Sequence, residues 1–224
     1  MARRASAPTA APAAAPRRTQ RERSQHAEEA LLDAAATLFA RRGVDQTSLA
    51  DIGELAGYSR GLANHHFGSK ATLIEQLAKR FQNQFVERFP LDRDAQDTIE
   101  VLTDLVESYF VAISRRSKTA RAFFVMWGAA IASDAQLRPV FAADDAQFRA
   151  GVETLLRQGQ DNGSVDPSVD PSAGALALVG MLRGVMAQYL IDPKTVDLST
   201  TVQTCQQFVR QTFAAPRKTR RAKT

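Results

Sequence analysis

Residues 47–70 constrain the fold more than any other stretch of the chain. Apolar residues recur there at helical spacing, and Ser48 followed by Asp51 has the pattern of a helix N-cap with a capping-box acid. Gly57 stands where this helix would end, and Gly readily takes the left-handed conformation that follows many helices. Gly53 lies inside the helix at a cost of about 1 kcal/mol relative to Ala, so we expect a second helix to cross closely there.

The second helix, with Ser59 as its expected N-cap, runs to about His66 and has two different faces. The expected inner face carries Ala63, His66 and Phe67. The expected outer face is mostly short or polar and carries Arg60, Gly61, Leu62, Asn64 and His65. A helix-turn-helix places the start of its second helix in the DNA major groove, where Arg can bind guanine, Asn can bind adenine and an apolar group can contact the thymine methyl. The outer face therefore predicts base reading.

Residues at fixed spacing extend this pattern in both directions: LLDAAATLFARRG at 31–43, then Thr47, Ser48, Ile52, Ala56, Gly57, Ser59, Gly61, His66, Phe67, Ser69 and Lys70. In these positions residues 24–75 resemble the N-terminal domain of the TetR family of bacterial transcriptional regulators. The resemblance implies a three-helix domain that binds double-stranded DNA. Asn64 departs from the family pattern, which commonly has a phosphate-binding Tyr at this position, so a base contact by Asn64 is an open alternative.

Several polar residues around the second helix are expected to hold the DNA backbone. Thr47 and Ser48 can donate to phosphates, although capping a helix would occupy the same hydroxyls. Lys70 lies in the first turn of the next helix and can approach a phosphate, with simple solvation as the alternative. The complete set of expected DNA contacts is Thr47, Ser48, Ser59, Arg60, Gly61, Leu62, Asn64, His65 and Lys70.

Positive charge is concentrated in the two tails. The net charge is +5, yet residues 1–24 hold six Arg and one Glu, and residues 216–224 hold five Lys or Arg and no acid. A basic arm beside a DNA-reading helix can lie along phosphates or enter the minor groove. The candidates are Arg17, Arg18, Arg21 and Arg23. The alternative is a solvated, disordered tail, which we favour for the C-terminal run.

Helical periodicity continues through the rest of the chain and predicts an all-α protein. The expected order is a disordered Ala/Pro-rich tail at 1–23, a helix-turn-helix domain at 24–70, a linking helix at 71–90, a larger helical domain at 91–215 and a basic tail at 216–224. Within the larger domain we expect helices at 98–114, 115–132, around 141–156, at 172–190 and at 198–213.

The helix at 172–190 is apolar nearly all round and contains small residues, namely Gly174, Ala177, Gly180 and Gly184. One small domain cannot easily bury all of the apolar surface of such a helix, which favours a two-fold interface with a second copy of the chain. In the TetR family the last two helices usually form this interface. A dimer would meet half-sites about 34–36 Å apart on a roughly palindromic operator. The alternative is that both helices are internal core.

The resemblance also implies a small-molecule effector in the larger domain. The aromatic residues expected to line its pocket are Phe110, Phe123, Phe124, Trp127, Phe141, Phe148 and Tyr189, with Arg121 or Gln188 as a polar anchor. Aromatic residues at helical spacing are more often plain core, so this alternative stays open for each of them.

Enzyme, metal and membrane functions find little support in the sequence. His65 and His66 point about 100° apart on a helix, and Cys205 lies in an apolar helix without a neighbouring His. Lys70 follows a Gly-Ser pair but lacks the rest of a phosphate-binding loop. Arg183 interrupts the longest apolar stretch. We expect no cofactor, no metal ion and no membrane contact, and the single Cys and the lack of a secretory signal favour the cytoplasm.

Three hypotheses about function follow. The first is a dimeric, ligand-responsive regulator of transcription, with repressor favoured over activator. The second is a non-specific DNA binder that acts through its basic tails, and the third is a helical small-molecule binding module without DNA function.

Overall fold

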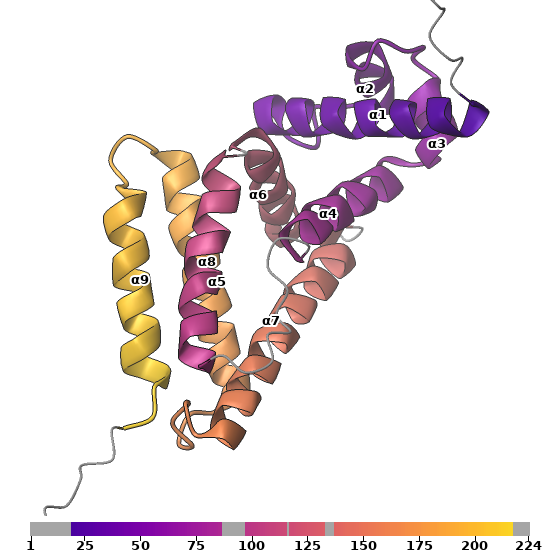
Figure 1. The fold of residues 1–224 in the computed structure, drawn as a ribbon. Coiled ribbons are helices and arrows are strands. Elements are labelled where there is room, and N and C mark those ends of the chain that lie inside the picture. The colour runs from indigo at the N-terminus through magenta and orange to yellow at the C-terminus, as the bar shows by residue number, and fades with distance from the viewer. Residues whose placement is uncertain (1–18, 87–96, 116, 133–136, 217–224) are drawn as a thin grey trace, which may run out of the picture.

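The structure is a computed structural model that describes residues 19–86, 97–115, 117–132 and 137–216, and every regular element in these ranges is an α-helix (Figure 1). The helices are α1 Gln20–Arg42, α2 Leu49–Leu55, α3 Leu62–Phe67, α4 Lys70–Val86, α5 Thr98–Arg115, α6 Ser117–Ala132, α7 Leu137–Asn162, α8 Pro171–Ile191 and α9 Leu198–Phe213. The predicted all-α class is confirmed. The expected ends of the linking helix at 87–90, most of the N-terminal tail and the C-terminal run lie outside the described residues.

The first helix begins earlier than the expected boundary at residue 24. The Thr19 hydroxyl accepts from the Glu22 amide at 3.2 Å, and the Glu22 carboxylate accepts from the Thr19 amide at 2.7 Å. This capping box starts α1 at Gln20, so Arg21 and Arg23 belong to the helix and not to a disordered arm. At the other end Gly43, with φ of 84°, stops the helix as predicted.

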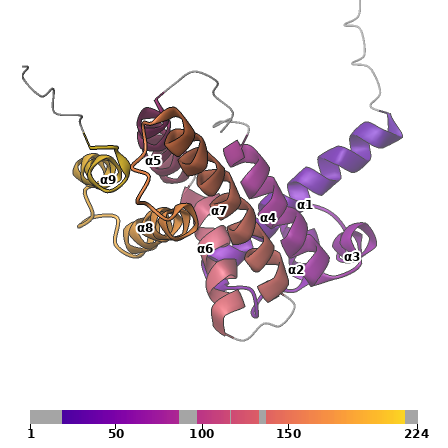
Figure 2. The same ribbon diagram turned by 90° about the horizontal axis from the view of Figure 1, so that it is seen from below.

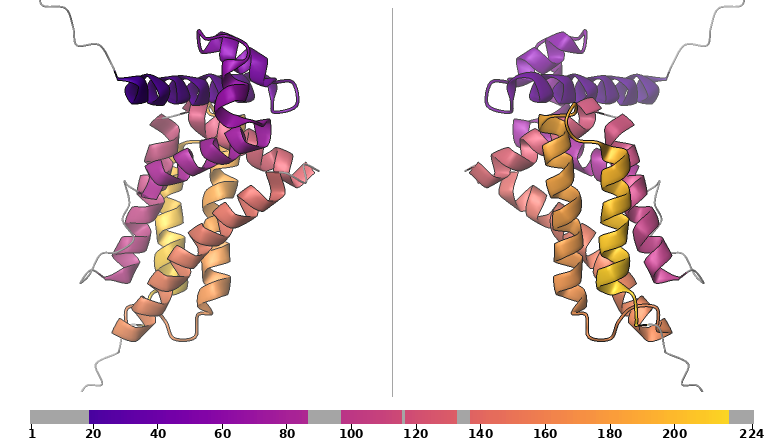
Figure 3. Two further views of the ribbon diagram at one scale, coloured as in Figure 1. Left: turned by 90° about the vertical axis from the view of Figure 1, so that its right-hand side faces the viewer. Right: turned by 90° about the vertical axis from the view of Figure 1, so that its left-hand side faces the viewer.

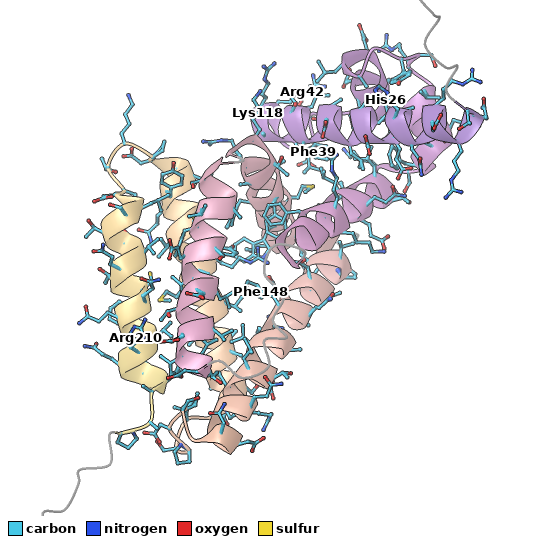
Figure 4. All side chains as sticks on the ribbon, in the orientation of Figure 1. His26, Phe39, Arg42, Lys118, Phe148 and Arg210 are labelled. Carbon is cyan, nitrogen blue, oxygen red and sulfur yellow. The ribbon has the colours of Figure 1, made fainter. Side chains whose placement is uncertain are left out.

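The DNA-binding domain expected at 24–70, here called the head, contains α1 to α3 and does not form its core alone. Phe39 of α1 is fully buried, and the cluster around it includes residues of α3 and α4 as well as Phe123, Met126 and Phe141 of α6 and α7. In Figure 4, Phe39 lies on the side of α1 that faces α6. The packing of α1 on α6 therefore connects the head to the larger domain through a shared hydrophobic core.

A second hydrophobic core fills the larger domain between α5, α7, α8 and α9. Asp170 begins α8 by accepting from the Ala173 amide at 2.9 Å, with Pro171 as the first helical residue. The helices at 98–114, 172–190 and 198–213 appear within one residue of their expected ends. Phe81 and Phe124 pack against both cores, so the two units are joined by side-chain contact.

The two ends of the molecule carry different surfaces. α3 and the pair α8 and α9 lie at opposite edges when the molecule is seen from below (Figure 2). The right panel of Figure 3 shows α8 and α9 side by side with no other helix in front of them. Among the described helices, α8 alone is long and apolar enough to cross a membrane, and a large part of it is buried in the second core.

Candidate nucleic-acid interface

The turn between α2 and α3 is compact. Gly57 has φ of 79°, and the Tyr58 amide donates to the Gly53 carbonyl at 2.9 Å. A Cβ atom on Gly53 would lie 2.6 Å from the Ser59 carbonyl oxygen, which is closer than real contacts allow. The close approach predicted at Gly53 is confirmed, but its partner is the turn at Ser59 and Arg60 that precedes the second helix.

The expected N-cap at Ser59 is wrong. α3 begins at Leu62, Gly61 stands at the capping position, and no side chain caps the helix. The Leu62 amide donates instead to the Ser59 carbonyl at 3.0 Å, because residues 59–61 form a further turn before the helix. Ser59 is exposed and its hydroxyl is not engaged in capping α3.

α3 presents one buried and one exposed face. Ala63 and Phe67 are buried in the head, at 0% and 5% exposure, and hold the helix against α2 and α4. Arg60, Gly61, Asn64 and His65 are exposed, and His66 is half-buried. Leu62, expected on the outer face, is half-buried and packs against the head core. The remaining outer face is polar and accessible, which is the arrangement that base reading needs.

Thr47 and Ser48 differ in accessibility. Thr47 is 2% exposed and its hydroxyl donates to the Gly43 carbonyl at 2.8 Å, so it closes the loop between α1 and α2. Ser48 is exposed, and its hydroxyl donates to the Asp51 carboxylate at 2.7 Å and accepts from the Asp51 amide at 3.2 Å. Hydrogen bonds from Ser48, and then the charge of Arg42 at 2.6 Å, hold the pKa of Asp51 below its ordinary value.

Lys70 has internal partners. Its Nζ atom donates to the carbonyls of Val44 at 3.0 Å and Thr47 at 3.1 Å. These bonds join the first turn of α4 to the loop between α1 and α2. The hydroxyl of Ser69 accepts from the Thr72 amide at 3.1 Å and caps the same helix, as predicted.

Comparison with protein families agrees with this geometry. Residues 31–77 match the model described as bacterial regulatory proteins, tetR family, and residues 98–214 match the model described as BetI-type transcriptional repressor, C-terminal. The chain belongs to the TetR family of bacterial transcriptional regulators.

Individual relatives extend over most of the chain. The HTH-type transcriptional regulator TtgR of Pseudomonas putida is 26% identical over 190 residues, which cover 83% of this chain and 90% of the relative. The HTH-type transcriptional repressor KstR2 of Mycolicibacterium smegmatis is 31% identical over 141 residues, 62% of this chain and 68% of the relative. A solved complex of SmeT with triclosan is 25% identical, has a TM-score of 0.73 and covers 84% of this chain and 91% of its own. TtgR and KstR2 are a regulator and a repressor of transcription, respectively.

In the family's C-terminal domain the structure gathers most of the aromatic residues predicted for an effector pocket. Phe123 stacks on Phe81 at 4.4 Å between ring centroids and contacts Phe124 and Phe141, and Phe124 contacts Trp127 at 6.2 Å. The remaining predicted residues, Phe110, Phe148 and Tyr189, belong to or pack against the second core. Arg121 and Gln188 are both exposed, so neither can serve as the polar anchor expected inside the domain.

Arg183 of α8 is a charged residue buried inside this domain. Its guanidinium donates to Asp144 at 2.9 Å and to Asp145 at 3.0 Å. Trp127 Nε1 donates to the other oxygen of Asp145 at 3.0 Å. The sequence signal was a lone charged residue in an otherwise apolar helix, but its partners lie 39 and 38 residues away.

Burial shifts the titration of this cluster. Burial raises the pKa of Asp144 above its ordinary value, and the charge of Arg183 opposes that rise. Burial also raises the pKa of the Tyr109 hydroxyl, again opposed by Arg183. The guanidinium is therefore the group that makes buried carboxylates tolerable among aromatic rings.

Proposed function

We propose that the protein is a dimeric repressor that binds a palindromic operator through α3 and releases it when a small effector binds the C-terminal domain. The single observation that carries the proposal is the division of α3 into two faces. Ala63 and Phe67 fix the helix in the head, while Arg60, Asn64 and His65 remain exposed. A rigid helix with free polar side chains can enter a major groove without disturbing the fold.

In this proposal two residues contact the base edges and so read the DNA sequence. Arg60 can donate two hydrogen bonds to guanine and Asn64 can pair with adenine, and each such bidentate contact discriminates by about 1–3 kcal/mol. Gly61 gives the backbone close access to the groove, while Ser59 and His65 are exposed donors for phosphates. Ser48 is also exposed, but its hydroxyl has to leave the Asp51 carboxylate before it can donate to a phosphate. These positions are supported by exposure and by the family match.

Three of the expected DNA contacts receive a different role. Thr47 is closed into the loop after α1, and Lys70 is bonded to two carbonyls of that loop. Leu62 is partly covered by the head. We propose that these residues set the height and angle of α3 on the DNA and that the exposed residues make the contacts.

The proposed dimer surface is formed by α8 and α9. Leu176 of α8 and Phe208 of α9 are 59% and 55% exposed, although both are large apolar residues. Gly180 and Gly184 are exposed, and a Cβ atom on either would meet open space. An apolar face with small residues lets a second helix pair approach closely, so a four-helix contact between two copies supports the two-fold arrangement of the heads.

An effector must prefer one arrangement of the two heads, because only differential affinity shifts a conformational equilibrium. The route is supported by packing: α6 contacts α1 of the head, and α8 contacts α6 and α7. A ligand bound among α6, α7 and α8 can therefore change both the angle of the head and the dimer face. The relatives support a regulator that works in the cytoplasm and needs no catalytic group.

The test is a selection of bound fragments from random DNA with the full chain, followed by anisotropy titrations. Arg60→Ala combined with Asn64→Ala should remove the preference for the selected site and leave weak, salt-sensitive binding. Arg138→Ala, an exposed residue of α7, is the matched control and should change nothing. Unchanged binding by the double variant would favour a non-specific binder, and no DNA binding by the wild type would favour a ligand-binding module.

A further inference from the structure

All three histidines of the chain lie in its DNA-binding part. His26 belongs to α1, and His65 and His66 are consecutive residues of α3. Histidine is the only side chain whose ordinary titration lies between about pH 5 and pH 8. A change of pH within this range therefore changes the charge of the helices that present α3 to DNA.

The fixed charges of these helices cancel. Residues 19–86, which contain α1 to α4, hold eight Lys or Arg and eight Asp or Glu. Three of the positive charges are held in ion pairs, namely Arg42 with Asp51, Lys79 with Glu75 and Arg80 with Asp33. Binding to DNA depends on positive charge that displaces counterions from the phosphates. A proton on an imidazole supplies positive charge that the balanced fixed residues do not.

The position of His65 suits it to carry this charge. His65 is exposed on the outer face of α3, directly after Asn64, whereas His66 is half-buried. The centroids of the two imidazole rings are 6.1 Å apart, with an angle of 80° between the ring planes. Two positive charges at this distance repel each other, so we expect each head to take up one proton, on the more exposed ring of His65.

The charged side chains near α3 leave this imidazole without a carboxylate partner. The elements packed against α3 and the turn before it carry Asp51, Glu54, Arg60, Lys70, Glu75, Lys79 and Arg80. Asp51 and Glu75 already form ion pairs with other residues, and none of the described carboxylates forms one with His65 or His66. His26 has its own neighbour, since its Nδ1 atom lies 3.5 Å from the Tyr58 hydroxyl. A negative partner for a charged His65 therefore has to come from outside the protein.

We propose that the imidazolium form of His65 binds a phosphate of the operator, so that the protein takes up protons when it binds DNA. This inference rests on the proposed function, because it assigns a charge-dependent contact to the same helix. A hydrogen bond from a charged donor to a phosphate is stronger than one from a neutral donor, so the phosphate favours the protonated ring. The complex then holds more protons than the free partners, and operator affinity rises as pH falls.

The size and the pH range of the effect follow from this linkage. A shift of one unit in the titration of a group on binding is equivalent to about a tenfold change in affinity, which gives up to about a hundredfold for two heads. For an ordinary histidine the gain is complete below about pH 6.5 and is lost as pH rises through about 7.5. Between about pH 8.5 and pH 6 we therefore expect affinity to increase about fiftyfold.

The experiment measures operator affinity by anisotropy with the full chain at about pH 6 and pH 8.5, each over a series of salt concentrations. The duplex is one selected from random DNA near neutral pH. Each neutralised phosphate contributes about 0.9 to the slope of log K against log salt, so the slope of a dimer should be steeper by about 2 at the lower pH. A purely structural role of His65 would leave this slope unchanged.

Three variants separate the charge of His65 from other effects of pH. His65→Gln keeps a polar side chain without the charge and should lose both the gain in affinity and the steeper slope. His65→Lys has a permanent charge and should bind at the higher pH as tightly as the wild type binds at the lower pH. His26→Gln is the matched control, an exposed histidine of α1, and should keep the wild-type pH dependence within about twofold.

Equal wild-type affinity at the two pH values would overturn the inference, and so would a gain that survives His65→Gln. The wild-type comparison stands even if a variant does not fold. A protein that binds its operator selectively with the same affinity at both pH values contradicts this inference alone. A protein that binds no DNA selectively at either pH contradicts the proposed function.

Discussion

Replacing Lys70 with Met separates an internal role from contact with DNA. The substitution keeps the apolar stem of the side chain and removes the ammonium group. In the structure this group donates to the carbonyls of Val44 and Thr47 at 3.0 and 3.1 Å, across the junction between α4 and the loop after α1. The variant therefore loses two hydrogen bonds that fix the base of the helix-turn-helix.

The expected loss of stability follows from those two bonds. Hydrogen bonds from a charged donor contribute about 1.5–3 kcal/mol each when buried. Lys70 is half-buried, and water can replace part of what is lost, so we expect the free energy of unfolding to fall by about 2 kcal/mol in total. For a chain of this size each kcal/mol lowers Tm by about 2–4 °C, which predicts a fall of several degrees.

The assay combines thermal unfolding with operator titrations over a series of salt concentrations. A phosphate contact contributes about 0.9 to the slope of log K against log salt, so losing one in each head would lower the slope by about 2 in a dimer. The internal role predicts weaker operator binding at every salt concentration with an unchanged slope. Lys79→Met, which breaks an exposed ion pair with Glu75, is the control and should shift unfolding by less than about 1 kcal/mol. An unchanged Tm together with a lower slope would refute the internal role.

Three further predictions use other parts of the molecule. Phe39→Ala should destabilise the shared core by about 3–5 kcal/mol in chemical unfolding, and a smaller loss would contradict its burial. Gly180→Glu should leave the helical circular dichroism signal intact but yield monomers in sedimentation, whereas Gly128→Glu, also facing open space, should leave dimers unchanged. Asp197 has its pKa lowered to about 2 by hydrogen bonds from Thr200 and Ser199, so its carboxylate stabilises the fold above its unfolded pKa and this contribution is lost as pH falls. The difference in Tm between wild type and Asp197→Asn should therefore be constant at neutral pH and should shrink progressively as pH falls from about 4 to about 2; a difference at about pH 2 as large as that at neutral pH would contradict this assignment.

Local patterns predicted the helices well, because their causes lie within a few residues. Ser48 and Asp51 cap α2, Ser69 caps α4, and the left-handed residues Gly43 and Gly57 follow α1 and α2. Thr19 and Glu22 form a capping box of the same kind at the start of α1. The low-complexity composition of the preceding tail instead favoured a disordered segment up to residue 23, which is wrong for residues 20–23.

The site depends on contacts that no local pattern contains. Lys70 donates to carbonyls 26 and 23 residues earlier in the chain, whereas the sequence suggests a phosphate contact or simple solvation. The carboxylates that bind Arg183 lie 39 and 38 residues away in the sequence. Local sequence alone therefore does not distinguish a buried, ion-paired Arg183 from a charge that only interrupts an apolar helix. Polarity alone suggests Arg121 or Gln188 as an anchor, but the rotation of their helices leaves both side chains exposed.

The central claim is that two copies of the chain each present α3 to one half of a single operator. Multi-angle light scattering of the protein bound to a selected duplex, combined with hydroxyl-radical footprinting, tests it directly. We predict two chains on the duplex and two protected half-sites about 34–36 Å apart. A single chain on the duplex, or equal protection of every sequence supplied, would contradict the account.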